Sequence, residues 1–180
     1  MKRPSIAALG LVALLTATAC SSSSSSSPSS TPANGTTVTR FTATLSPANE
    51  TPPITGAEST GSGTATIDLN VTRDASGTIT AQSINFEVNM QGFPSTTIVN
   101  IAHIHTGATG VAGPILVSTT LNPGEVVLTN GAGTFTRTGV TGGLTAAVAQ
   151  SFLDNPAGFY FNVHTTANPG GVMRGQLVKQ

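Results

Sequence analysis

The three histidines of this chain are the residues whose type and spacing could do chemistry. His103 and His105 are separated by one residue, and His164 follows much later. On a β-strand, residues i and i+2 project from the same face, so His103 and His105 would lie side by side. If the strand of His164 meets theirs, three neutral imidazoles converge. Such a set suits zinc or copper, with a fourth position for water or for an acidic residue such as Glu50.

A structural explanation of the same histidines stays open. Along residues 97–105, Val99 and Ile101 share the histidine face, while Ala102 and Ile104 point to the other face. A strand with apolar residues on both faces is typically buried on both sides. A buried neutral histidine can pair its ring nitrogens with a backbone carbonyl and a neighbouring donor, and bind no metal. The two interpretations differ in whether the three rings converge.

Glu50 and Arg174 form a second pair of chemical interest. In the structural interpretation, Arg174 fixes a chain end by donating hydrogen bonds to backbone carbonyls or to Glu50, a pairing that is costly to break when buried. In the functional interpretation, its guanidinium helps to hold an anionic ligand beside the histidines. We favour the structural role and keep both residues as structural or ligand-binding candidates.

Other catalytic motifs are missing from the sequence. No GxSxG motif surrounds a serine, and the glycine-rich residues 106–113 lack the lysine of a P-loop. The two-metal site of copper–zinc superoxide dismutase needs more histidines than the three present. The sequence therefore names no catalytic residue and favours a protein that is not an enzyme.

The elements that must position these residues show the period-two alternation typical of β-strands. Asn130-Gly131, between VVLT and AGTFT, predicts a tight hairpin. The segments expected to be strands are residues 41–45, 65–71, 84–90, 97–105, 114–121, 158–165 and 172–179.

One helix is expected to interrupt the strands. In TGGLTAAVAQSFLDNP, Leu144, Val148 and Phe152 recur every four residues, with Thr141 as the predicted cap and Pro156 beyond the end. About eight or nine short strands with one helical insertion predict an all-β fold, a Greek-key β-sandwich of the immunoglobulin or superoxide-dismutase type. With a single cysteine in the chain, its stability must come from two apolar sheet faces pressed together.

The N-terminal residues indicate export. Lys2 and Arg3 precede an apolar run, and Ala17-Thr18-Ala19 is a small-residue cleavage site, so residues 1–19 are predicted to be a signal peptide. Cleavage would leave Cys20 first, and LTATAC resembles a bacterial lipobox, in which this cysteine is lipidated. We expect a lipid anchor on Cys20 at the bacterial cell membrane or outer surface, with secretion as the alternative.

Residues 20–37 are serine-rich and are expected to form a disordered tether before a domain of residues 38–180. Removing Lys2 and Arg3 leaves five basic residues against seven acidic ones, a net charge of −2. Without a basic cluster, nucleic acid is not an expected partner. The charged fraction of 8%, with abundant threonine and glycine, is typical of an extracellular all-β protein.

Three stretches of this domain resemble the motifs of the CHRD domain, which is named after chordin and also occurs in exported bacterial proteins. They are NETPP at residues 49–53, AHIHTGATGVAGPILV, and GFYFNVHTTANPGGVMRGQL. The resemblance runs from about residue 41 to 178. It places Glu50, the three histidines and Arg174 on motif positions, and it implies no reaction. In chordin these repeats belong to an extracellular protein that binds growth-factor ligands.

Together these features predict a surface-anchored extracytoplasmic CHRD-domain lipoprotein that acts as a non-catalytic binding or structural module. Its expected partners are the membrane, through Cys20, and an extracellular protein or matrix component. His103, His105 and His164 are its candidate ligands for copper or zinc. The alternative function is a mononuclear copper or zinc metalloprotein, either a metal carrier or an oxidoreductase.

Overall fold

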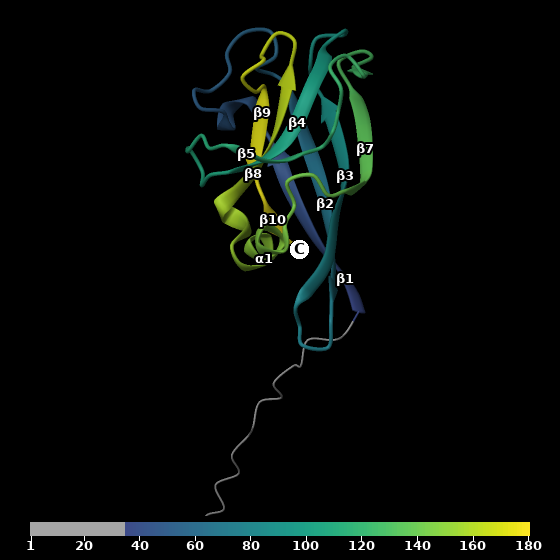
Figure 1. The fold of residues 1–180 in the computed structure, drawn as a ribbon. Coiled ribbons are helices and arrows are strands. Elements are labelled where there is room, and N and C mark those ends of the chain that lie inside the picture. The colour runs from purple at the N-terminus through teal and green to yellow at the C-terminus, as the bar shows by residue number, and fades with distance from the viewer. Residues whose placement is uncertain (1–34) are drawn as a thin grey trace, which may run out of the picture. The chain divides into compact units, whose positions relative to one another are not determined.

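The computed structural model describes residues 35–180, which form two antiparallel β-sheets and one short α-helix (Figure 1). The predicted signal peptide, Cys20 and most of the predicted tether lie outside the described residues. The first strand begins at Gly35 and pairs residues 35–37 with residues 71–73, so these three positions of the expected tether belong to a strand. Within residues 35–180, no helix is long and apolar enough to cross a membrane.

The first sheet contains the segments in which apolar residues alternate most regularly. Phe41, Ile67 and Phe86 are buried in it, and the residues between the buried positions face outward. Its strand order is β10–β1–β2–β3–β7. Its members are β1 (Gly35–Leu45), β2 (Ser62–Arg73), β3 (Ile79–Gln91), β7 (Gly133–Val140) and β10 (Val178–Lys179).

The second sheet carries the histidines and Arg174. Its strand order is β5–β4–β8–β9, and β6 also pairs with β4. Its members are β4 (Ile98–Thr106), β5 (Ile115–Ser118), β6 (Val126–Val127), β8 (Phe159–Thr165) and β9 (Met173–Gln176). His103 and His105 lie on β4, His164 on β8 and Arg174 on β9, so three neighbouring strands hold all four side chains.

The two sheets pack face to face around one hydrophobic core. Phe86 of β3 and Phe161 of β8 meet between the sheets, with ring centroids 5.8 Å apart. The chain crosses between the sheets from β3 to β4 and again from β7 to β8, with β7 beside β3 and β8 beside β4. This interlocked order is that of a Greek-key sandwich. The predicted all-β sandwich with one short helix is confirmed.

Asn130-Gly131 forms the predicted tight turn, but its two arms do not continue as a paired hairpin. Both residues have the positive φ of such a turn, 52° and 73°, and one bridge joins Thr129 to Ala132. Beyond that bridge the two arms separate, because β6 pairs with β4 in the second sheet and β7 pairs with β3 in the first. Leu128 and Phe135 are both buried in the core. The turn therefore carries the chain from one sheet to the other.

The last predicted strand, residues 172–179, is divided between the two sheets. β9 pairs with β8 in the second sheet, and β10 pairs with β1 in the first. Leu177, between them, is buried in the core. The chain crosses closely over β1 at Gly175, where a Cβ would overlap the Thr44 carbonyl oxygen. An alternation pattern contains no signal for such a change of sheet.

The helix α1 (Ala146–Asp154) forms as expected but is capped by Thr145, not by Thr141. The Thr145 hydroxyl accepts a hydrogen bond from the Val148 amide at 3.2 Å. Gly143 lies between the two threonines with a φ of 77°, a left-handed conformation that prevents a helix from starting earlier. Two short 3-10 turns complete the fold: η1 (Pro47–Asn49) and η2 (Pro156–Gly158).

Candidate metal centre

The candidate site lies on the outer face of the second sheet, the side turned away from the core. Along β8, Phe161 and Val163 point into the core, so Tyr160, Asn162 and His164 take the outer face. The strand register sets His103 opposite Asn162, and Asn162 opposite Arg174 on the next strand. The further members of this face are His105 and Gln176, each paired with Tyr160.

A β-bulge in β4 decides which residues accompany the histidines. The register with β8 shifts between Val99 and Ile101. Val99 consequently points into the core, where it is fully buried, and Ile101 alone stays on the histidine face. The expectation that Val99 and Ile101 share that face is wrong, because one extra residue in a strand reverses the side-chain alternation beyond it.

Loops cover this outer face, so that the three histidines are buried although they point away from the core. His103, His105 and His164 are 5%, 8% and 7% exposed. Gly113 contacts His105, and Pro169 contacts His164, through hydrogen bonds to the rings. The end of η1 and the residues that follow it cover the Arg174 side of the same face.

The structure brings the three imidazoles together. The ring centroids are 5.2 Å apart for His103 and His164, 5.6 Å for His103 and His105, and 6.3 Å for His105 and His164. One ring nitrogen from each lies within 4.8 Å of the other two. Nitrogens bound at about 2 Å to one tetrahedral ion lie about 3.3 Å apart, so the rings need to close by about 1.5 Å at most.

Two backbone carbonyls orient two of the rings. His105 Nδ1 lies 3.0 Å from the Gly113 carbonyl oxygen, and His164 Nδ1 lies 2.8 Å from that of Pro169. A carbonyl oxygen only accepts, so each Nδ1 must carry the hydrogen. Each Nε2 then has a free lone pair, and neither Nε2 has a hydrogen-bond partner. Donation from the second ring nitrogen to a carbonyl is the usual arrangement of a metal-binding histidine.

Burial keeps the three rings neutral. It lowers the pKa of each imidazole, and the adjacent His164 and His105 rings lower that of His103 further, to about 4. The carbonyl hydrogen bonds of His105 and His164 partly oppose this effect. At neutral pH the cluster is thus uncharged, the protonation state in which imidazole binds a metal ion.

Glu50 and Arg174 lie next to the cluster but outside it. Glu50 Oε1 accepts a hydrogen bond from Asn162 Nδ2 at 2.5 Å, and its Oε2 lies 3.9 Å from Arg174 Nε. Burial raises the pKa of Glu50 to about 7, although Arg174 and the hydrogen bonds from Thr51 and Asn162 act in the opposite direction. Glu50 is thus placed to hold Asn162 and not to serve as the fourth ligand.

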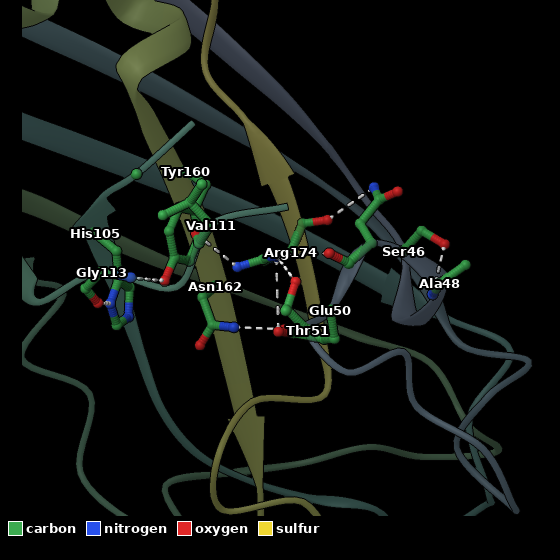
Figure 2. Close-up of polar contacts among 12 residues, drawn as sticks. Ser46, Ala48, Glu50, Thr51, His105, Val111, Gly113, Tyr160, Asn162 and Arg174 are labelled. Atoms are coloured by element: carbon green, nitrogen blue, oxygen red, sulfur yellow. Dashed lines mark hydrogen bonds and ion pairs between the residues drawn. The ribbon is translucent and has the colours of Figure 1, made fainter. Parts of the chain in front are cut away.

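Arg174 joins three segments of the chain (Figure 2). Its guanidinium donates to the carbonyl oxygens of Asn49 at 2.6 Å and Val111 at 3.2 Å, and to the Thr51 hydroxyl. It also lies over the Tyr160 ring, 4.7 Å from its centroid. These are the contacts of a residue that fixes loops against a sheet, with no donor directed to the histidines.

The residues of this face lie in a segment that a known family covers. The family model described as the CHRD domain matches residues 41–177, from β1 to the end of the second sheet. This chain belongs to the CHRD family. No curated protein and no solved structure is similar enough to this chain to count as a match.

The alternation along residues 158–165 placed two further residues on the face of His164 in this CHRD domain, but sequence reasoning gave them no role. The Tyr160 ring stacks on His105, with centroids 4.8 Å apart and planes 6° from parallel, and its hydroxyl accepts the Gly113 amide at 3.2 Å (Figure 2). Asn162 lies between His103 and Arg174. The sequence pattern indicates their position, because both residues alternate with the buried phenylalanines of β8 and therefore share the face of His164.

A third residue, Glu58, also supports the site, and no pattern in the neighbouring sequence indicates this role. It is buried in the CHRD domain, and its Oε2 accepts from the Thr165 hydroxyl at 2.6 Å and from Asn168 Nδ2 at 2.5 Å. In the sequence, Thr165 directly follows His164, and Asn168 directly precedes Pro169. Glu58 therefore fixes the loop whose Pro169 carbonyl orients His164.

Proposed function

We propose that this chain is an exported, lipid-anchored CHRD-domain protein that acts as a non-catalytic binding or structural module and holds one zinc or copper ion through His103, His105 and His164. One observation carries the metal assignment. Each of these residues has a buried ring nitrogen without a hydrogen-bond partner, and the three rings offer nitrogens within 4.8 Å of one another.

The chemistry of these nitrogens supports an ion over a purely structural cluster. A buried histidine that serves packing alone satisfies both ring nitrogens with protein groups. Here the Nε2 atoms of His105 and His164 are lone-pair acceptors, and leaving such atoms without a partner costs about 1–3 kcal/mol each. A divalent cation satisfies all three rings at once.

Metal loading tests this assignment. After incubation with zinc or copper and removal of the excess, the purified full-length protein is expected to retain one ion per chain by elemental analysis. With free ion about 1,000-fold above its dissociation constant, the free energy of unfolding should rise by about 4 kcal/mol. His103→Ala, His105→Ala and His164→Ala should each lose the retained ion and the added stability, because each removes one of three ligands.

Asn100→Ala is the matched control, because Asn100 lies on β4 and its side-chain oxygen accepts a hydrogen bond from Thr166, away from the histidines. It should bind the ion like the unmodified chain. Failure to retain either metal, or full retention by a variant in which all three histidines are replaced by alanine, would refute the metal assignment.

The anchor is proposed from the sequence, because residues 1–34 lie outside the described part of the chain. Mass spectrometry of the mature protein from a bacterial membrane fraction is expected to show an N-terminal Cys20 with covalently attached acyl chains. Cys20→Ser should release the protein from the membrane fraction and leave the metal content unchanged. An unmodified Cys20, or a mature chain that begins elsewhere, would contradict the anchor and not the metal site.

A further inference from the structure

Asn162 carries a buried acceptor atom that the histidines do not explain. Its side chain is 3% exposed, and its Nδ2 donates to Glu50 Oε1 at 2.5 Å. The amide nitrogen therefore faces Glu50, and Oδ1 faces away from it (Figure 2). Glu50 lies against Arg174 on the β9 side of β8, and His103 is the cross-strand neighbour of Asn162 on the β4 side.

This oxygen belongs to a group of buried polar atoms without hydrogen-bond partners on one face. Within residues 35–180, five buried side-chain nitrogen or oxygen atoms lack a hydrogen-bond partner. Four belong to the three histidines and Asn162, and the fifth is the Thr97 hydroxyl. An ion would satisfy the ring nitrogens. The Asn162 oxygen needs a hydrogen-bond donor, because amide oxygens are uncommon among the ligands of zinc.

We propose that an ion held by His103, His105 and His164 keeps an exchangeable fourth ligand, a water that donates a hydrogen bond to Asn162 Oδ1, and that small anions can replace this water. This inference rests on the metal site of the proposed function. Glu50 does not fill the position, since its oxygens face Asn162 and Arg174. A structural zinc site typically has four protein ligands and no open position. A site with three protein ligands keeps its fourth position free for water or another small ligand.

A pocket that could admit a small ligand lies beside the site. A pocket of about 240 Å³ opens between residues 50–54 and the loop of residues 167–171. Two of its lining residues contact the site directly: Glu50 holds Asn162, and the Pro169 carbonyl orients His164. A triatomic anion is much smaller than this pocket.

The test uses cobalt(II) as a coloured probe ion and azide as the anion. The full-length protein loaded with one cobalt per chain is expected to change its visible spectrum in a saturable way as azide displaces the water. Azide cannot donate a hydrogen bond, so it loses the contact with Asn162 that the water makes. Removing the Asn162 oxygen should therefore tighten azide binding, roughly tenfold for one hydrogen bond.

That comparison is made in a Glu50→Gln background, so that the change at Asn162 does not leave a buried carboxylate without its hydrogen-bond donor. Arg174 loses the same charge partner in every protein compared. E50Q/N162L should bind azide about tenfold more tightly than E50Q. E50Q/N100L is the control, with the same Asn-to-Leu change elsewhere in the second sheet, and it should match E50Q.

The outcomes separate the two proposals. Failure to take up stoichiometric cobalt overturns both the metal site and the exchangeable ligand. Full uptake with a spectrum that azide leaves unchanged overturns only the exchangeable ligand, and this result needs no variant. Saturable azide binding that is equal in E50Q and E50Q/N162L overturns the role of Asn162.

Discussion

Replacing Arg174 with alanine is expected to lower the free energy of unfolding by about 3–5 kcal/mol, a typical loss when one partner of a buried charge pair is removed. The side chain is 3% exposed and donates hydrogen bonds to the end of η1, to the residues just after it and to the loop that contains Val111. Its guanidinium also lies over the ring of Tyr160. Its loss leaves the Asn49 and Val111 carbonyls without these donors. It also removes the cation beside the buried carboxyl of Glu50.

Urea denaturation of the metal-free protein measures this effect and separates it from ligand binding. Arg174→Lys is the matched variant, because it keeps the charge and loses the planar fork that reaches several acceptors at once, so it should show an intermediate loss. A loss below about 1 kcal/mol in Arg174→Ala would show that the loops hold their places without the guanidinium.

The Arg174→Ala loss should also depend on pH, through Glu50. The pKa of Glu50 is about 7 in the folded protein against an ordinary value of 4.5, so the folded state binds more protons between these values. Stability from Glu50 is therefore present below pH 4.5 and decreases as the pH rises to about 7. Arg174 lowers this pKa, and without it the decrease should extend to higher pH. An equal loss at pH 5 and pH 8 would contradict this coupling.

Replacing Gly113 with alanine is expected to cost about 3 kcal/mol of stability and about 10–100-fold in metal affinity. A Cβ at this position would overlap the carbonyl oxygen of Thr106, a backbone atom that cannot rotate away. The loop would have to move, and it would take the Gly113 carbonyl from His105 and the Gly113 amide from Tyr160. His105 would lose both its tautomer and its ring orientation.

Gly142→Ala is the control for this prediction. A Cβ there meets no atom within 4 Å, and Gly142 lacks the positive φ that would strain an alanine. Urea denaturation of the metal-free variants measures the loss in the free energy of unfolding. Zinc titration against a competing chelator measures the loss in metal affinity. Wild-type affinity in a destabilised Gly113→Ala protein would show that the carbonyl does not position His105.

Local patterns in the sequence determined much of this CHRD domain. Steric preferences within a strand act over neighbouring residues, so alternation was sufficient to locate most strands and to put His103 and His105 on one face. The same alternation set His164 with Tyr160 and Asn162, away from Phe161. Three motifs in the right order were sufficient to predict the CHRD family, and the family match over residues 41–177 confirms it.

Tertiary structure alone decided how these local pieces meet. Which strands become neighbours, and in which register, depends on how the whole core packs, and that information is spread over residues far apart in the chain. It set β4 beside β8, so that the rings of His103 and His164 lie 5.2 Å apart, and it drew β6 and β7 into different sheets. The positions of Glu50 and Gly113 over the site follow from loop packing, for which a local pattern holds no signal.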